Sequence, residues 1–305
     1  MILIESSFLS LPYKESVPVR GKVINKNRFL KVLFFGEEFY FSTLPGFHNL
    51  SLEETDYKIK TFFQDKVLRF DDIDFSKIFF NTINNNLNYS IDGETLFVIE
   101  SLILGQLKKS HPHLIHETNN LINDLYRSAL GPSYYINSKC LKIKIAPTSI
   151  DKTIKLLNEL HRLNSKLMFR LDGNRLFELN EMIEFEKMLK INISDSLFSL
   201  IDYIEEPFKN FSDSYLFLKR SNLKIAMDES FLAFLGMHEK IFPDNIPVVV
   251  KPSLTGISPI YNWMKINKNK RIIISSSFEH PTVNVGLSFL ASMRPSEFHG
   301  LENFL

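Results

Sequence analysis

Cysteine, net charge and long apolar runs are scarce in this sequence. A single cysteine, Cys140, excludes an internal disulfide framework and a cysteine-based zinc site and suits a reducing compartment, so we expect a cytoplasmic protein. Lysine and arginine number 36 against 35 aspartate and glutamate, so no long-range field favours a polyanion. No apolar stretch approaches the roughly 18 residues of a membrane span, and the N-terminus lacks the basic start of a signal peptide. We therefore expect neither a nucleic-acid partner nor membrane association.

The 305 residues, 44% of them hydrophobic, suffice for one large barrel and a smaller domain. In the first third, residues 29–43 are rich in β-forming side chains around a turn at Gly36, and residues 17–23 are predicted to add another strand. Helices are predicted at 52–63, after a Ser51 and Glu54 capping box, and at 92–107. This part of the chain is expected to be α+β.

Beyond residue 134, short apolar runs alternate with amphipathic stretches, which predicts a repeat of strands and helices. The clearest amphipathic stretch is 150–163, where Ile150, Ile154, Leu157 and Leu160 lie on one helical stripe. Such a repeat is typical of a β/α barrel.

A polar residue follows each predicted strand of this repeat. In chain order these residues are Lys144, Asp172, Glu205, Asp228, Lys251 and Ser275. The intervals between them, 28, 33, 23, 23 and 24 residues, each fit one strand and helix. Because all strands of a β/α barrel run the same way, their C-terminal ends meet at one rim, where active sites of this fold lie. Three carboxylates and two lysines are expected to converge there.

The residue types at this rim indicate a metal-assisted reaction. Asp172, Glu205 and Asp228 offer three hard oxygen ligands, which suit Mg²⁺ with its remaining positions left to water and a substrate carboxylate. Lys142 and Lys144, two apart on one strand, both point into the barrel, and Lys144 lies nearer the rim. A divalent cation and a second ammonium disfavour the charged form of a lysine, so the pKa of Lys144 is expected to fall toward the working pH and make it a usable base. Any one such residue is usually a solvated loop residue, but five in this order are hard to obtain by accident.

Seven segments carry a resemblance to a known family: KIKI (142–145), RLDGN (170–174), IEEP (204–207), MDES (227–230), VKPSLTG (250–256), SSSFE (275–279) and, in the first third, STLPGF (42–47). With them the chain resembles the o-succinylbenzoate synthase family, enolase-superfamily enzymes of menaquinone biosynthesis. The resemblance implies an α/β fold, a modified (β/α)7β barrel at 95–305 with an N-terminal α+β capping domain at 1–94 that bears a substrate-specificity loop. It also implies one Mg²⁺ per subunit, which Mn²⁺ can replace.

Carried over by position, the resemblance assigns the chemistry. Asp172, Glu205 and Asp228 bind Mg²⁺, and Lys144 removes the α-proton, by the mechanism general to the superfamily in which Mg²⁺ stabilises an enediolate. Lys251 stays cationic beside the intermediate, and Lys142 supports Lys144. The substrate is 2-succinyl-6-hydroxy-2,4-cyclohexadiene-1-carboxylate, a small molecule that loses water by syn-elimination to give 2-succinylbenzoate. The expected substrate contacts are Asn174, Ser275, Ser276, Ser277, Thr255, Gly46 and Phe47.

Other functions stay open. A racemase of N-acylamino acids or a dipeptide epimerase would exchange an α-proton through two lysines, although the acidic pair that usually holds the substrate amine of dipeptide epimerases is not found after Ser275. A muconate cycloisomerase is a weaker alternative. A non-catalytic barrel would normally have lost ligands or lysines, and all five are present. The protein is expected to be a monomer or a small homo-oligomer.

Two further groups of residues are not assigned to the site. Glu206 and Glu229 adjoin predicted ligands but alternate away from them, so we expect structural or supporting roles. His111, His113 and His116 are not taken as a metal site, because no matching carboxylate or cysteine set is near them in the sequence.

Overall fold

The computed structural model describes residues 4–19, 22–43, 48–64, 91–110, 119–120, 122–123, 135, 137–232, 246–277 and 279–301. The chain divides into two compact units. Unit 1 comprises Met1–Thr118, Lys251–Lys268 and Ile274–Leu305, and unit 2 comprises Asn119–Val250 and Asn269–Ile273. The domain boundary between residues 94 and 95 stays a prediction, and helix α3 (Gly93–Ser110) runs across it.

Unit 1 begins with a three-stranded antiparallel sheet in the order β1 (Glu5–Val19), β2 (Lys22–Phe34) and β3 (Glu37–Ser42). Phe35 and Gly36 join β2 to β3 with φ values of 50° and 80°, as a two-residue hairpin turn requires. The segment predicted as one further strand, 17–23, instead contains the end of β1 and the start of β2. β1 lies at the edge of the sheet, where a proline such as Pro12 is tolerated, and this proline obscures the strand pattern.

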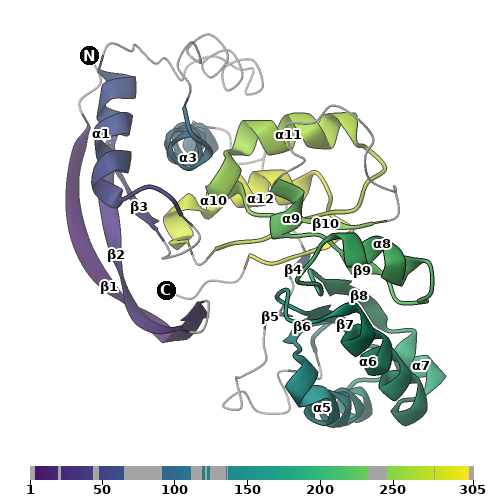
Figure 1. Ribbon diagram of the computed structural model, residues 1–305. Helices are drawn as coiled ribbons and strands as arrows, with labels where there is room; N and C mark the ends of the chain where they lie inside the picture. Colours follow the sequence, from purple (N-terminus) through teal and green to yellow (C-terminus); the bar gives the residue numbers. More distant parts are fainter. Residues whose placement is uncertain are drawn as a thin grey trace. The chain divides into compact units, whose positions relative to one another are not determined.

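The helices of unit 1 surround α3. Helix α1 (Leu52–Phe63) has the predicted bounds and capping box, in which Ser51 Oγ accepts the Glu54 N–H and the Glu54 carboxylate accepts the Ser51 N–H. Helix α3 packs against α1, α10 (Pro252–Thr255), α11 (Ile257–Ile266) and α12 (Asn284–Ser292) (Figure 1). A 3-10 helix (Pro281–Val283) and strand β12 (Phe298–His299) also belong to this unit. Within the described ranges, no helix is both long and apolar enough to cross a membrane.

Unit 2 contains the predicted strand and helix repeat (Figure 1). Its parallel sheet has the order β5 (Ile122–Asn123), β6 (Cys140–Lys144), β7 (Met168–Asp172), β8 (Ile201–Glu205) and β9 (Ile225–Ala226). The connections hold a 3-10 helix (Pro147–Ser149), α5 (Ile150–Leu163), α6 (Leu179–Asn192), α7 (Asp195–Phe198) and α8 (Ser212–Leu218). The short strand β4 (Asn119–Asn120) precedes β5, and α9 (Glu229–Leu232) follows β9. Strand β10 (Val248–Val250) pairs with β11 (Ile272–Ile274).

The strands of unit 2 are buried on both faces, as barrel strands are. One face packs on the helices in a large apolar cluster that includes Ile143, Leu171 and Ile204. The opposite face holds a smaller cluster of Tyr203, Ala226, Val249 and Ile273. Because side chains two residues apart share a face, the strand ends on this inner face carry the polar residues that the sequence analysis predicted.

Candidate active site

The predicted ligands lie at one edge of the parallel sheet of unit 2. Lys144 faces Asp172 across β6 and β7, and Asp172 faces Glu205 across β7 and β8. Glu205 faces Ala226, two residues before Asp228. Asp172, Glu205 and Asp228 are all buried. Parallel pairing in register thus brings the ends of four successive strands together, as the spacing predicted.

Lys142 holds two of these carboxylates. Its Nζ lies 3.0 Å from Asp172 Oδ2 and 2.6 Å from Glu205 Oε1. Burial by itself would lower the pKa of Lys142, but the nearby charges of Asp172, Glu205 and Asp228 hold this pKa well above its ordinary value. Lys142 is therefore a permanent cation within the carboxylate group. It was predicted to support Lys144, and the structure places it on the predicted metal ligands.

The donor set fits a divalent cation in charge and in ligand type. The three carboxylates carry more negative charge than the Lys142 ammonium offsets, and carboxylate oxygens are the preferred protein ligands of Mg²⁺. Among the described residues, no three His, Cys, Asp or Glu side chains are gathered closely enough to hold a metal ion. The Lys142 ammonium contacts two of the three carboxylates, Asp172 and Glu205.

Lys144 and Asn174 lie at the same strand ends. Lys144 is exposed and follows Lys142 by two residues on β6, so the two lysines share a face and Lys144 lies nearer the rim. The Asn174 N–H donates to Asp172 Oδ1 over 3.1 Å. The predicted fall in the pKa of Lys144 and the predicted substrate contact of Asn174 stay predictions.

Lys251 and Thr255 belong to unit 1. Lys251 directly precedes α10, and Thr255 is the last residue of this helix. Between them, Ser253 Oγ donates to Ser277 Oγ over 3.2 Å, and both side chains are buried. The structure therefore brings Ser277 to the segment that carries Lys251. Lys144 belongs to unit 2, and that Lys251 faces it stays a prediction.

The other two serines are tied to the C-terminal segment. Ser275 forms a parallel β-bridge with Gly300, and the Ser276 N–H donates to the Gly300 carbonyl over 2.7 Å. The Ser277 N–H donates to Glu279 Oε2 over 2.5 Å. Their side chains stay predicted substrate contacts.

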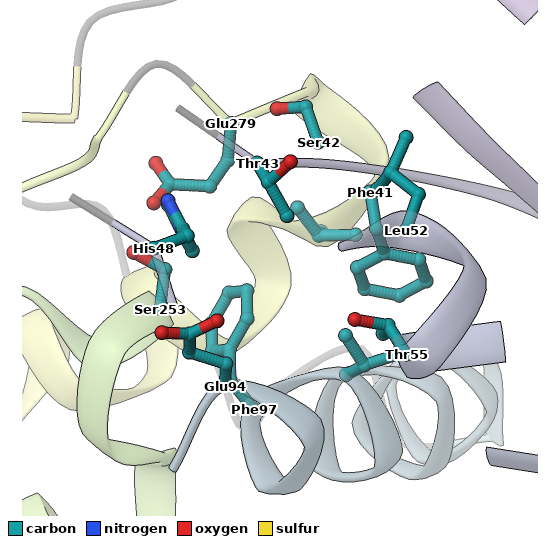
Figure 2. A pocket seen from close by; sticks show the side chains of 12 residues that line it. Phe41, Ser42, Thr43, His48, Leu52, Thr55, Glu94, Phe97, Ser253 and Glu279 are labelled. Atoms are coloured by element: carbon teal, nitrogen blue, oxygen red, sulfur yellow. The ribbon is translucent and has the colours of Figure 1, made fainter. Parts of the chain in front are cut away.

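A small pocket of unit 1 lies beside the predicted specificity loop. Gly46 and Phe47 themselves lie outside the described residues. Figure 2 shows Ser42 and Thr43, the first two residues of this loop, and His48, which follows it, around one space with Ser253 and Glu279. Glu279 is buried, and its Oε1 has no hydrogen-bond partner among the described residues. The pocket thus joins the loop ends to the Lys251 segment.

Glu100 of α3 anchors the chain that follows Lys251. Its fully buried carboxylate accepts the backbone N–H groups of Ile257 and Ser258 at the start of α11, the second over 3.0 Å. Burial raises the pKa of Glu100 to about 7, and these hydrogen bonds oppose the rise. Gly256, just before α11, has a φ of 87°, and a Cβ there would meet Leu96 Cδ2 at 2.6 Å. Only glycine fits this position.

Glu94, Glu100 and Arg175 were not predicted as functional residues from the sequence. Glu94 accepts the backbone N–H groups of Asn49 and Leu50, over 2.7 and 3.1 Å, and so holds the chain after the predicted loop. One signal for Glu100 is present in the sequence, because it is the only charged residue between 95 and 107 in an apolar helix. A charge in such a place indicates a buried partner.

Comparison with known proteins finds likeness in structure but not in sequence. No family model and no curated protein matches the chain. o-Succinylbenzoate synthase from Thermosynechococcus elongatus BP-1, solved with Mg in its active site, is 15% identical with a TM-score of 0.69, over 97% of this chain and 92% of that one. MenC from Desulfotalea psychrophila LSv54 is 18% identical with a TM-score of 0.68, over 98% and 93%. The L-Ala-D/L-Glu epimerase from Bacillus subtilis is 14% identical with a TM-score of 0.69, over 99% and 89%.

These likenesses span nearly the whole of each chain. These likenesses confirm the predicted fold class. The antiparallel N-terminal sheet and the parallel repeat of strands and helices agree with it. The chain therefore has the fold of the enolase superfamily, an α/β barrel with an N-terminal capping domain.

Proposed function

We propose that this protein is a Mg²⁺-dependent enzyme that removes the proton next to a substrate carboxylate, and that it is an o-succinylbenzoate synthase. The observation that carries the proposal is the group formed by Asp172, Glu205 and Lys142 at adjacent strand ends, with Asp228 one strand further. The solved o-succinylbenzoate synthase with the same fold has Mg in its active site.

Asp172, Glu205 and Asp228 would hold the metal ion. A bound Mg²⁺ supplies positive charge that stabilises an enediolate formed from the substrate carboxylate. Lys142 lies two residues before Lys144 on β6. Its charge disfavours a second ammonium nearby and so favours the neutral, basic form of Lys144.

Lys144 acts as the base in this proposal. Its amine takes the α-proton of the substrate, and the resulting ammonium returns a proton to the departing hydroxyl, so that one water is lost and the ring becomes aromatic. Lys251 stays protonated and stabilises the negative charge of the intermediate. Asn174, Thr255 and the serines at 275–277 are proposed to contact the substrate.

The substrate assignment rests on the motif segments and on two of the structural neighbours. Racemisation or epimerisation of N-acylamino acids or dipeptides is the second candidate, because the Bacillus subtilis epimerase has an equal TM-score. Both reactions begin with removal of an α-proton, so Lys144 and the carboxylates serve either one.

The test is an assay of the purified protein with 2-succinyl-6-hydroxy-2,4-cyclohexadiene-1-carboxylate and Mg²⁺, followed by product absorbance. We expect turnover that EDTA abolishes, that Mg²⁺ or Mn²⁺ restores, and that Lys144→Ala reduces by a factor of at least about 100, the lower range for a general base. Lys152→Ala, an exposed lysine of α5, is the matched control and is expected to retain full activity.

A parallel assay follows exchange of the α-hydrogen of N-succinylamino acids and dipeptides in D2O. Exchange without dehydration would replace the synthase by a racemase or epimerase. Silence in both assays, with a folded protein and excess Mg²⁺, would leave a non-catalytic barrel as the better account.

A further inference from the structure

Three residues near the predicted metal ligands have a strained backbone. Asn174, Arg175 and Glu206 have φ values of 45°, 57° and 38°, in the left-handed region that residues other than glycine seldom adopt. They follow Asp172 and Glu205, the last residues of β7 and β8. These two strands are neighbours in the sheet (Figure 1). Such conformations persist only where the surrounding contacts hold them, and they concentrate at functional sites.

The contacts that hold these residues converge on Glu206. Its side chain is buried, and its Oε1 lies 3.0 Å from Arg175 Nε and also accepts the hydroxyl of Ser230. Its Oε2 accepts the backbone N–H of Asp228 over 2.8 Å. Arg175 also donates to Ser230 Oγ over 3.1 Å. One carboxylate therefore links the chain segments after β7, β8 and β9.

The backbone of Glu206 joins the same segments. Its N–H donates to the Ala226 carbonyl over 2.9 Å, and its carbonyl accepts the Arg175 N–H over 2.7 Å. Next to Glu206, Pro207 packs so closely on Gly173 that a Cβ at Gly173 would lie 2.6 Å from Pro207 Cα. The ends of β7 and β8 are thus held together tightly. The Glu206 side chain also accepts a hydrogen bond directly from the backbone N–H of Asp228.

We propose that Glu206 is a positioning residue that fixes the Asp228 backbone, and through it the third carboxylate of the metal centre; this rests on the metal centre of the proposed function. Glu206 is not itself a ligand here, because its two oxygens already accept hydrogen bonds from Asp228, Arg175 and Ser230. Supporting residues of this kind orient metal ligands, and their loss typically lowers metal affinity by a factor of about 10 to 100.

Replacement by glutamine tests the carboxylate with little change in shape. Glutamine offers one acceptor oxygen and an NH2 group, so an N–H donor is placed against either the Asp228 N–H or the Arg175 guanidinium. We therefore expect Glu206→Gln to weaken binding of Mn²⁺ by a factor of about 10 to 100, measured on the full chain by electron paramagnetic resonance of free Mn²⁺.

Glu186→Gln is the matched control. Glu186 is also a buried carboxylate of unit 2 that pairs with a cation, Lys190 at 2.7 Å, and accepts a backbone N–H, that of Asn222 over 3.3 Å. Asn222 precedes β9, whereas Asp228 follows this strand. Glu186→Gln is therefore expected to change stability but not Mn²⁺ affinity, so a loss confined to Glu206→Gln reports positioning and not general destabilisation.

A second measurement keeps the inference apart from the proposed function. Hydrogen exchange of the 225–232 peptide, followed by mass spectrometry without metal, is expected to be faster in Glu206→Gln than in the wild type. Unchanged exchange would overturn the inference, and so would faster exchange with an unchanged Mn²⁺ affinity. Faster exchange in a protein whose wild type binds no Mn²⁺ would overturn the proposed metal centre, while the hold of Glu206 on Asp228 would stand.

Discussion

Glu100 provides a test of how a buried charge contributes to the stability of unit 1. The perturbation is Glu100→Gln, which keeps the shape of the protonated side chain and removes its titration. The wild-type carboxyl is fully buried and accepts hydrogen bonds from the N–H groups of Ile257 and Ser258. Burial raises its pKa from 4.5 to about 7. In the unfolded chain the same group titrates near its ordinary value.

The sign follows from proton linkage. Below pH 4.5 the carboxyl is protonated in both states, and its contribution to stability is fully present. As the pH rises toward 7, the unfolded state releases the proton first, so the free energy of unfolding falls. A difference of about 2.5 pKa units, at about 1.36 kcal/mol per unit, corresponds to a loss of about 3 kcal/mol once the pH exceeds the folded pKa.

The assay is urea unfolding of the wild type and of Glu100→Gln at pH 5 and pH 8. The wild type is expected to lose about 2 kcal/mol relative to the variant between these pH values, since part of the linkage is complete by pH 5. Gln106→Ala is the control, because Gln106 is a buried residue of α3 that donates to the Phe34 carbonyl and does not titrate. The loss in free energy of unfolding that Gln106→Ala causes is expected to be the same at pH 5 and pH 8.

Parallel pH curves for the wild type and Glu100→Gln would refute this reasoning. They would mean that Glu100 titrates alike in the folded and unfolded states, so that its hydrogen bonds to α11 balance its burial. A wild type that gains stability relative to the variant as the pH rises would mean that these hydrogen bonds outweigh burial.

Three further predictions concern packing, a buried ion pair and a helix cap. Gly173→Ala is expected to lower the stability of the protein by about 1 to 3 kcal/mol, because the new Cβ meets the Pro207 backbone at 2.6 Å; an unchanged thermal midpoint would contradict this. Asp202→Asn removes the carboxylate on which fully buried Arg170 lies at 2.9 Å and is expected to cost about 3 to 5 kcal/mol in urea unfolding at pH 7. Burial by itself would raise the pKa of Asp202, but the contacts with Arg170 and Arg271 lower it by more, so the folded-state pKa lies below 3.8. The stabilisation by this carboxylate is therefore lost as the pH falls below 3.8, and the stabilities of the wild type and the variant should converge in that acidic range. Ser51→Ala is expected to cost about 1 kcal/mol by thermal unfolding, and Ser51→Asp to restore most of it, because either side chain caps α1; equal losses in both variants would argue against the cap.

Local patterns in the sequence were enough to predict much of the fold. The helices at 52–63 and 150–163 have the predicted bounds, because a capping box and a hydrophobic stripe are local signals that act within a few turns. The order and spacing of Lys144, Asp172, Glu205 and Asp228 predicted adjacent strand ends, since parallel strands of a repeat place equivalent positions at one edge. β1 was missed, because a proline-containing edge strand has a weak pattern.

Contacts between distant residues were decided only by the tertiary structure. The support of Lys144 by Lys142 stays a prediction. That the Lys142 ammonium lies on Asp172 and Glu205 is seen only in the structure, because a buried charge is stable only beside opposite charges and these come from other strands. Glu100 meets the start of α11, 157 residues further along the chain, and Glu206 meets the backbone of Asp228, 22 residues away. The sequence by itself determined at which strand ends the predicted site residues lie. Which carboxylate holds which donor depends on the packing of α3 and of the loops after β7, β8 and β9, and no local pattern records that packing.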